Sequence, residues 1–267
     1  MVRYFRVFML AVCAVQVFLA AAFFVQAPFA VRLWPLSYTN QMAFIFIASI
    51  FAAAAVSTLW CVVTKEYAAL AGIGLDYIVI LVPLSVLFFQ MAARTRSAPA
   101  ANFAAACVVG ALFGLGLFLW SRRIPARDPR PTPKFVRGAF LFFVIALLIV
   151  GGQMALKAPN VLPWNVTTEG GIIYGWMFLG AAAYFVYGLL RPGWYNAAGQ
   201  LAGFLAYDLV LIVPFLQRLP TIAPDRRWSL IIYIVVIVLS GLLAIYYLFF
   251  NPATRLWRAD RLSPAAT

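Results

Sequence analysis

The feature that most constrains this chain is a series of eight apolar stretches, each about 20 residues long. Crossing the hydrocarbon layer takes about 20 helical residues, because each residue rises about 1.5 Å and the layer is about 30 Å thick. Membrane β-strands are about half as long and alternate in polarity. We therefore predict an all-α, polytopic integral membrane protein. Its eight transmembrane helices are predicted at approximately 7–27, 42–63, 68–91, 103–121, 138–156, 171–190, 197–217 and 229–249.

The composition agrees with a chain surrounded by lipid bilayer. Hydrophobic residues make up 66% of the 267 residues and charged residues 10%, which excludes an ordinary soluble domain. The net charge of +13 would suggest nucleic acid as the partner of a soluble protein. In a membrane protein we attribute it to topology and expect no nucleic acid. Abundant Arg and Ala with few Lys suggest a bacterium, and hence an inner-membrane protein.

The residue types that most catalytic and cofactor sites require are missing. The chain has no histidine, which removes His-bound haem, zinc and copper as well as a Ser-His-Asp triad. Its three cysteines, Cys13, Cys61 and Cys107, lie singly in different apolar stretches. No glycine-rich nucleotide motif occurs, and no lysine lies at mid-membrane depth to carry a retinal. We expect no cofactor, no metal site and no enzyme activity.

The basic residues are distributed unequally between the two sets of predicted loops. Short cytoplasmic loops retain Lys and Arg, so the side with more of them is predicted to be cytoplasmic. With the amino terminus inside, the cytoplasmic side holds 13 of the 20 basic residues: Arg3, Arg6, Lys65, Arg122, Arg123, Arg127, Arg130, Lys134, Arg137, Arg191, Arg255, Arg258 and Arg261. We therefore expect both termini in the cytoplasm. Arg94, Arg96, Arg226 and Arg227 on the other side oppose this orientation.

The most basic segment connects the fourth and fifth apolar stretches. Between Arg122 and Arg137 it has six basic residues, four prolines and a single acid, Asp128. We interpret it as a cytoplasmic linker that contacts anionic lipid headgroups, at roughly 1 kcal/mol for each basic residue near the surface. Docking of an acidic soluble partner is the alternative interpretation.

The two halves of the chain share a pattern of prolines and glycines. A shift of 131 residues places Pro28 on Pro159 and Pro83 on Pro214, and a shift of 127 places Pro125 on Pro252 and Gly114 on Gly241. This order predicts a parallel duplication of a four-helix unit. Units with an even number of spans insert in the same direction, so a two-fold axis along the membrane normal would relate them, with any site between them. The alternative is eight helices of merely similar composition.

The predicted organisation has four parts. The first four-helix repeat covers 1–121, and the basic, proline-rich linker covers 122–137. The second repeat covers 138–255, and a short cytoplasmic tail covers 256–267. Within this plan, Pro83 and Pro214 lie in the middle of equivalent helices and are expected to kink them, because proline removes a backbone hydrogen bond.

Two acids lie inside predicted spans, at nearly matching positions of the two repeats. Asp76 precedes Tyr77, whereas Asp208 follows Tyr207. An acid at this depth costs about 2.5–3.5 kcal/mol and normally faces the bundle interior or water. No Lys or Arg lies at matching depth, so each carboxyl group is expected to be neutral or able to exchange a proton. The alternative is that each is a hydrogen-bonded helix contact that serves assembly only.

These observations predict a small proton-coupled or cation-coupled transporter or channel. Its candidate site consists of Asp76, Tyr77, Tyr207 and Asp208, between the repeats, with Pro83 and Pro214 as kinks. The alternative is a non-catalytic subunit or scaffold of a larger membrane complex, which short loops and many aromatic residues favour. A partner protein or a second copy of the chain would then cover part of its surface.

Overall fold

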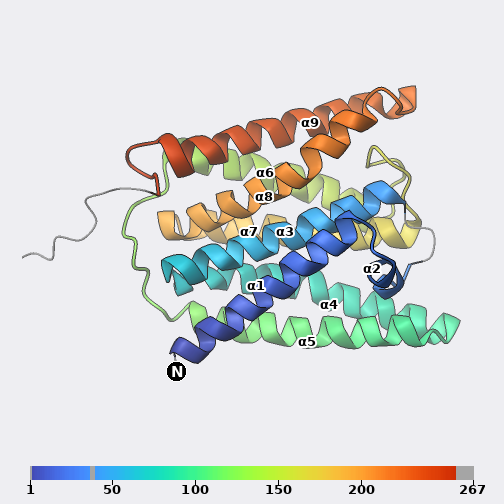
Figure 1. The fold of residues 1–267 in the computed structure, drawn as a ribbon, viewed down its shortest axis with the longest axis horizontal. Coiled ribbons are helices and arrows are strands. Elements are labelled where there is room, and N and C mark those ends of the chain that lie inside the picture. The colour runs from blue at the N-terminus through green and yellow to red at the C-terminus, as the bar shows by residue number, and fades with distance from the viewer. Residues whose placement is uncertain (1, 37–39, 257–267) are drawn as a thin grey trace, which may run out of the picture.

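The computed structural model describes residues 2–36 and 40–256. Most of the predicted tail at 256–267, with Arg258 and Arg261, lies outside the described residues. Within them the chain is almost entirely helical (Figure 1), and β-structure is limited to a single bridge between Pro131 and Gly193.

The long helices follow one another with short connections. In chain order the described elements are α1 (Val2–Phe24), α2 (Pro28–Leu33), α3 (Gln41–Thr64), η1 (Tyr67–Ala69), α4 (Leu70–Thr95), α5 (Ala98–Ser121), α6 (Lys134–Ala155), α7 (Thr168–Leu190), α8 (Trp194–Arg218), α9 (Pro224–Ile245) and η2 (Tyr246–Phe250). Eight helical segments in the described part are long and apolar enough to span a membrane, which confirms the predicted multi-pass helical fold. The short helix α2 was not anticipated from the sequence.

Most of the helices begin before the predicted spans, whereas α1 ends at Phe24, short of the predicted residue 27. Apolar residues mark only the part of a helix within hydrocarbon, whereas the helix continues until a cap ends it. The side chain of Ser97 accepts a hydrogen bond from the backbone of Ala100 and so starts α5 before the predicted residue 103. The side chain of Thr167 caps Gly170 at the start of α7. Two acids expected in loops, Glu169 and Asp225, lie in first helical turns.

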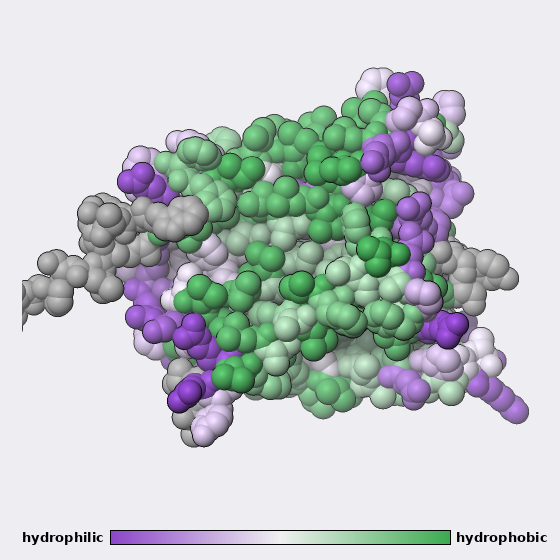
Figure 2. Space-filling view, in the orientation of Figure 1, coloured by the Kyte–Doolittle hydropathy of each residue, from purple (hydrophilic) through white to green (hydrophobic). Residues whose placement is uncertain are grey.

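The outer surface has the distribution of polarity that a bilayer requires. Figure 2 shows a broad apolar band across the middle of the molecule, with hydrophilic residues gathered at both ends of the bundle. Large apolar side chains point outward within this band, among them Leu112, Ile149, Leu209 and Leu239. The helical form of the spans lets most of their backbone groups form hydrogen bonds within each helix, as hydrocarbon requires. The protein is therefore a multi-pass membrane protein that contacts lipid.

The helix neighbours follow a regular scheme. Four inner helices form the centre, because α3 packs on α8 and α4 packs on α7. The other helices are peripheral: α1 packs on α3, α5 on α4, α6 on α7 and α9 on α8. These pairs match when α1, α3, α4 and α5 are aligned in order with α6, α7, α8 and α9. The α1–α3 pair then corresponds to α6–α7, the α4–α5 pair to α8–α9, and the α3–α8 pair to α7–α4. A two-fold related pair of units would have this arrangement, and the duplication itself stays a prediction.

Glycine allows the closest approaches between helices. A β-carbon added at Gly74 of α4 would lie 2.5 Å from the carbonyl oxygen of Gly114 on α5. On the other side of the bundle, a β-carbon at Gly175 of α7 would lie 2.8 Å from the carbonyl oxygen of Gly151 on α6. Backbones that come this close are typical of helix packing in membranes.

The segment between α5 and α6 lies across one end of the bundle. The amino terminus and the end of η2 lie at this same end, which we call the linker end (Figure 1). The opposite end, with α2 and the α6–α7 connection, is called the far end. The last turn of the predicted linker is helical, because α6 begins at Lys134.

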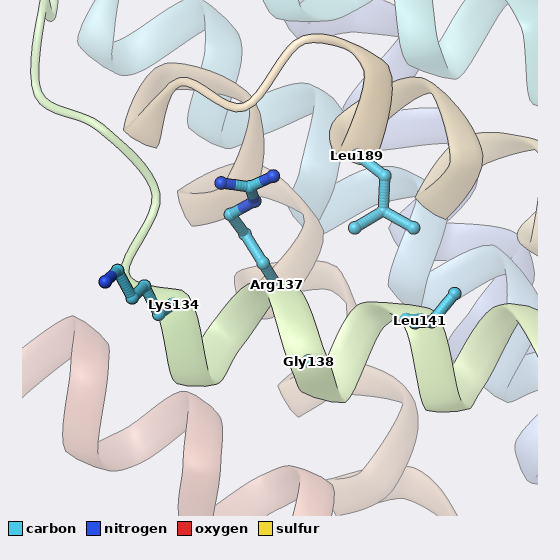
Figure 3. A pocket seen from close by; sticks show the side chains of 5 residues that line it. All are labelled: Lys134, Arg137, Gly138, Leu141 and Leu189. Carbon is cyan, nitrogen blue, oxygen red and sulfur yellow. The ribbon is translucent and has the colours of Figure 1, made fainter.

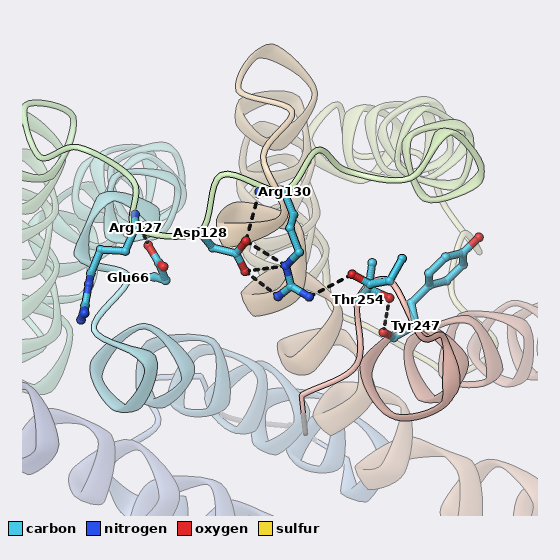
Figure 4. A network of polar contacts seen from close by, with 7 residues as sticks. Glu66, Arg127, Asp128, Arg130, Tyr247 and Thr254 are labelled. Atoms are coloured by element: carbon cyan, nitrogen blue, oxygen red, sulfur yellow. Dashed lines mark hydrogen bonds and ion pairs between the residues drawn. The ribbon is translucent and has the colours of Figure 1, made fainter. Parts of the chain in front are cut away.

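The linker is bonded to both halves of the chain. Its Arg127 donates a backbone hydrogen bond of 3.0 Å to Oε2 of Glu66, just after α3. Arg130 is held by Asp128 at 2.5 Å and donates a 3.0 Å hydrogen bond to the carbonyl oxygen of Ala253, after η2 (Figure 4). The backbone of Arg130 also accepts a 2.7 Å hydrogen bond from Trp194, at the start of α8. The linker therefore acts as a strap across the linker end.

Candidate functional site

Asp76 lies in the second turn of α4 and faces α7. A β-carbon added at Gly180 of α7 would lie 2.6 Å from Oδ1 of Asp76, so the carboxyl group rests against the neighbouring helix. This oxygen is buried and has no hydrogen-bond partner. Among the described residues no cation is placed against it. Asp76 is thus an acid within a span that has no cation beside it in the described part of the chain.

Tyr77, the next residue, points toward α1 instead. Nε2 of Gln16 donates a hydrogen bond of 2.5 Å to the Tyr77 hydroxyl. Oε1 of Gln16 stays buried without a partner. The hydroxyl of Thr58 on α3 lies near the same phenol but has no hydrogen bond of normal geometry. Three helices therefore meet here through polar side chains that are only partly satisfied.

Tyr184 brings α7 into the same group. Its ring covers α4, because a β-carbon added at Gly72 would lie 2.8 Å from it. Its phenolic oxygen is buried without a hydrogen bond of normal geometry, although Ser57 of α3 is nearby. Tyr184 is also close enough to Asp76 and Tyr77 to interact with them electrostatically.

Gln200 of α8 completes the group. Its Nε2 donates a 2.5 Å hydrogen bond to the backbone carbonyl of Tyr184, while its Oε1 lies against Gly188 without a partner. At the residue before Gln200, the hydroxyl of Ser57 donates a 3.1 Å hydrogen bond to the backbone carbonyl of Gly199. These two bonds join α8 to α7 and to α3.

We call this group the polar cluster; it consists of Gln16, Ser57, Thr58, Asp76, Tyr77, Tyr184 and Gln200. Five of its side chains carry a buried oxygen without a hydrogen-bond partner: Gln16, Thr58, Asp76, Tyr184 and Gln200. Buried polar atoms are as a rule hydrogen-bonded, to water or an ion where the protein offers no partner. Oxygen ligands with a single carboxylate suit a proton, water or a hard cation. In the described part of the chain, no three Cys, Asp or Glu side chains form a metal-binding group.

The polar cluster occupies the half of the bundle nearer the linker end. Ser57 and Thr58 lie in the last third of α3, which ends beside Glu66 and the strap. Gln200 lies in the second turn of α8, which starts at the strap. Asp76 is about 10 Å along α4 from its first residue, because each residue rises about 1.5 Å.

The half nearer the far end is filled by aromatic side chains. Phe46 of α3 is fully buried and contacts the rings of four residues: Trp164, Tyr174, Phe178 and Tyr207. Phe215 of α8 packs on Trp164 in the same region. We call this group the aromatic plug. The interface between the inner helices is therefore polar toward one end and aromatic toward the other.

Asp208, the second intramembrane acid, lies in a different environment. Its Oδ2 accepts a 2.7 Å hydrogen bond from Ser240 of α9, and its side chain lies against Gly241. Its Oδ1 is buried without a partner. The adjacent Tyr207 points away from it, toward Phe46, and its hydroxyl shares a hydrogen bond with Tyr233 of α9.

The four residues of the predicted site are thus divided among different neighbours. Asp76 faces α7 and Tyr77 faces α1. Tyr207 contacts both α3 and α9, and Asp208 faces α9. The two acids have no neighbour in common among the contacts described above. Pro83 and Pro214 both lie inside continuous helices, α4 and α8. That Asp76 and Asp208 serve one shared site stays a prediction, and Asp76 is the acid with other polar groups around it.

Equivalent glycines support the two tyrosine-acid pairs. A β-carbon at Gly114 of α5 would lie 2.8 Å from Cβ of Tyr77. A β-carbon at Gly241 of α9 would lie 3.8 Å from Cβ of Asp208. The shifts of 127 and 131 residues that align the halves place Gly114 on Gly241 and Tyr77 on Asp208. The two shifts differ, and that the two contacts correspond stays a prediction of the duplication.

Glu66 is a third buried acid, at the linker end and outside the spans. Only 6% of its surface is exposed, and it accepts the hydrogen bond of Arg127. Burial raises the pKa of Glu66 above its ordinary value, an effect that the Arg127 hydrogen bond partly offsets and the nearby Asp128 reinforces. The strap is therefore attached to a carboxyl group that holds its proton more readily than usual.

Tyr184 is the member of the polar cluster that the sequence did not single out. It stands in an apolar run between Ala183 and Phe185, without an adjacent acid to mark it. Gln16, Ser57, Thr58 and Gln200 lie within predicted spans, and polar residues of this kind most often make packing contacts between helices. A helical projection of α7 with Gly180 and Gly188 on the same face would have indicated the position of Tyr184.

Comparison with known proteins gives no match: no protein-family model, no curated protein and no solved structure matches the chain. The function is therefore inferred from the residues of the chain itself, beginning with Asp76.

Proposed function

We propose that this membrane protein is a small proton-coupled or cation-coupled transporter or channel with its site in the polar cluster. The observation that carries the proposal is the buried, unpartnered Oδ1 of Asp76, in a polar cluster that holds further buried oxygens without partners. A proton, a hydrated proton or a cation could bind these oxygens, which have no hydrogen-bond partner among the described residues. Asp76 is the group that accepts the charge, and Tyr184, one turn of α7 beyond Gly180, is the polar side chain that supports it.

Access to Asp76 is proposed from the linker end. Gln200 lies in the second turn of α8, which starts at the strap, and Ser57 lies in the last third of α3, so both polar residues are near this end. The aromatic plug around Phe46 closes the same interface toward the far end. In an alternating-access cycle, this arrangement would be the state in which Asp76 is reached from the linker end and blocked from the far end.

We propose that the linker end is cytoplasmic. The positive-inside rule favours it, because the amino terminus, the strap and most of the Lys and Arg residues gather there. The matching helix pairs and the Gly114 and Gly241 contacts support a duplicated four-helix unit. The Arg-rich, Lys-poor composition supports the inner membrane of a bacterium.

Asp208 is assigned a different role. Its hydrogen bond to Ser240 and its contact with Gly241 join α8 to α9, as a helix-packing contact would. This contact favours the alternative, in which the protein is a scaffold or subunit of a larger complex and the intramembrane acids serve assembly. The two functions differ in whether the purified protein alone moves ions.

The test is transport by the purified protein in liposomes. A pH-sensitive dye inside the liposomes reports proton entry under an imposed membrane potential, and parallel samples contain sodium or potassium gradients. We expect ion or proton flux well above that of protein-free liposomes. Absence of flux together with a stoichiometric partner in the native membrane would replace the transporter with the scaffold.

A further inference from the structure

A hollow lies where α6 begins and α7 ends, at the linker end of the bundle. It is lined by Lys134, Arg137, Gly138, Leu141 and Leu189 and encloses about 250 Å³ (Figure 3). The first four of these residues share one face of α6, and Leu189 is in the last turn of α7. The hollow is separate from the polar cluster, so nothing inferred from it depends on transport.

The lining changes from basic to apolar along α6. Lys134 and Arg137 are one turn apart, are exposed, and form no ion pair with any described residue. Leu141 follows one turn deeper and is 53% exposed. Leu189 is partly buried and faces it across the hollow (Figure 3). Two cations at the polar rim and an apolar wall below them complement an anionic headgroup attached to an acyl chain.

Gly138 is what keeps the hollow open. A β-carbon added at this position would meet no atom within 4 Å. The corresponding turn of α1 has the same order of charges and apolar groups, with Arg3, Arg6 and Leu10 at the spacing of Lys134, Arg137 and Leu141. At the position that corresponds to Gly138, α1 has Val7. The sequence thus favours such a site on the second half of the chain rather than the first.

We propose that this hollow binds one anionic phospholipid. Its phosphate lies between Lys134 and Arg137, and one acyl chain runs over Leu141 and Leu189. Arg and Lys bind phosphate oxygens with charge-assisted hydrogen bonds, and a basic site at the membrane interface attracts anionic headgroups. A free phosphate ion would use the two cations but leave the apolar wall uncovered. The lipid is therefore the occupant that matches the whole site.

The proposal is tested by native mass spectrometry of the detergent-purified protein with added phosphatidylglycerol. We expect a single bound lipid in the wild-type protein, displaced neither by phosphatidylcholine nor by inorganic phosphate. The double variant Lys134→Gln, Arg137→Gln is expected to bind about thirtyfold more weakly. Gly138→Leu keeps both charges but fills the hollow, so it is expected to lose the lipid as well.

The matched control is Gly152→Leu on the same helix. A β-carbon at Gly152 also meets no atom within 4 Å, but this residue is far from the hollow along α6. We expect Gly152→Leu to bind lipid as the wild type does, and all variants to show unchanged melting temperatures. Unreduced binding in Gly138→Leu, equal binding of phosphatidylcholine, or displacement by inorganic phosphate would each overturn the proposal.

Discussion

The hydroxyl of Ser240 donates a 2.7 Å hydrogen bond to Oδ2 of Asp208 and so joins α9 to α8 inside the bundle. Asp76, the other intramembrane acid, has no such donor on its buried Oδ1. The two acids look alike in the sequence but differ in their partners. This difference determines which acid we assign to transport and which to packing.

Substitution of Asp208 is expected to affect stability according to whether an acceptor remains. Asp208→Asn keeps an oxygen for Ser240 and should change the melting temperature little. Asp208→Leu removes this acceptor and leaves the Ser240 hydroxyl only the carbonyl oxygen of Ile237, so it should cost about 0.5–1.5 kcal/mol, the net value of one hydrogen bond. Thermal unfolding in detergent compares the two. Equal destabilisation by Asn and Leu would contradict the packing role of this contact.

Gly180 is expected to control the position of the Asp76 carboxyl group. A β-carbon there would lie 2.6 Å from Oδ1 of Asp76 and closer still to Cγ1 of Ile80, a buried branched side chain with little freedom to move. Gly180→Ala should therefore displace the carboxyl group and reduce flux, and overpacking against Ile80 should also lower the melting temperature. Gly171→Ala on the same helix is the control, because a β-carbon there meets no atom within 4 Å. Equal flux in the two variants would show that the position of the carboxyl group has no effect.

Gly114 is expected to be necessary for packing of α5 on α4. A β-carbon there would lie 2.9 Å from the carbonyl oxygen of Gly74 and 2.8 Å from Cβ of Tyr77, and neither atom can move without its helix. Gly114→Ala should destabilise the protein by about 1–3 kcal/mol through overpacking. Gly116→Ala, two residues away and without a contact within 4 Å, should be neutral. Similar melting temperatures for the two variants would be inconsistent with this close approach.

Glu66 is expected to make stability depend on pH. Because burial raises the pKa of Glu66, the folded protein binds this proton more tightly than the unfolded chain does. Stability should therefore fall as the pH rises from the ordinary Glu pKa to the raised pKa in the folded state, and stay level above it. Glu66→Gln removes the titration and keeps an acceptor for Arg127.

The comparison is thermal unfolding of wild type and Glu66→Gln across this pH range. The variant should lack the wild-type decline and become the more stable of the two at the upper end. Parallel pH profiles for the two proteins would mean that another group causes the decline.

The spans were predictable from the sequence because lipid restricts a helix to a fixed apolar length. The long helices were located within a few residues, and the prolines Pro83 and Pro214 were correctly expected inside helices. The short helix α2 and the path of the strap were not predictable. Both depend on contacts between distant segments, such as Trp194 with Arg130.

The candidate site was predictable only in part. The sequence indicates how deep a residue lies along its helix, but it does not indicate which neighbouring helix the side chain faces. Successive residues point about 100° apart on an α-helix. The exchanged order of Asp76-Tyr77 and Tyr207-Asp208 therefore turns the two acids toward different neighbours. The neighbours of Asp76 are determined by the packing of α4 on α7. The hydropathy of the sequence does not predict this packing.

The most direct measurement of the central claim is the initial rate of ion or proton entry into liposomes that contain Asp76→Asn. Asparagine keeps the size and an acceptor oxygen of Asp76 but cannot take up or release a proton, nor offer a cation its charge. Asp208→Asn is the matched substitution at the other intramembrane acid. We predict that Asp76→Asn abolishes flux, that Asp208→Asn retains it, and that both variants unfold near the wild-type temperature. Wild-type flux in folded Asp76→Asn protein would contradict the account.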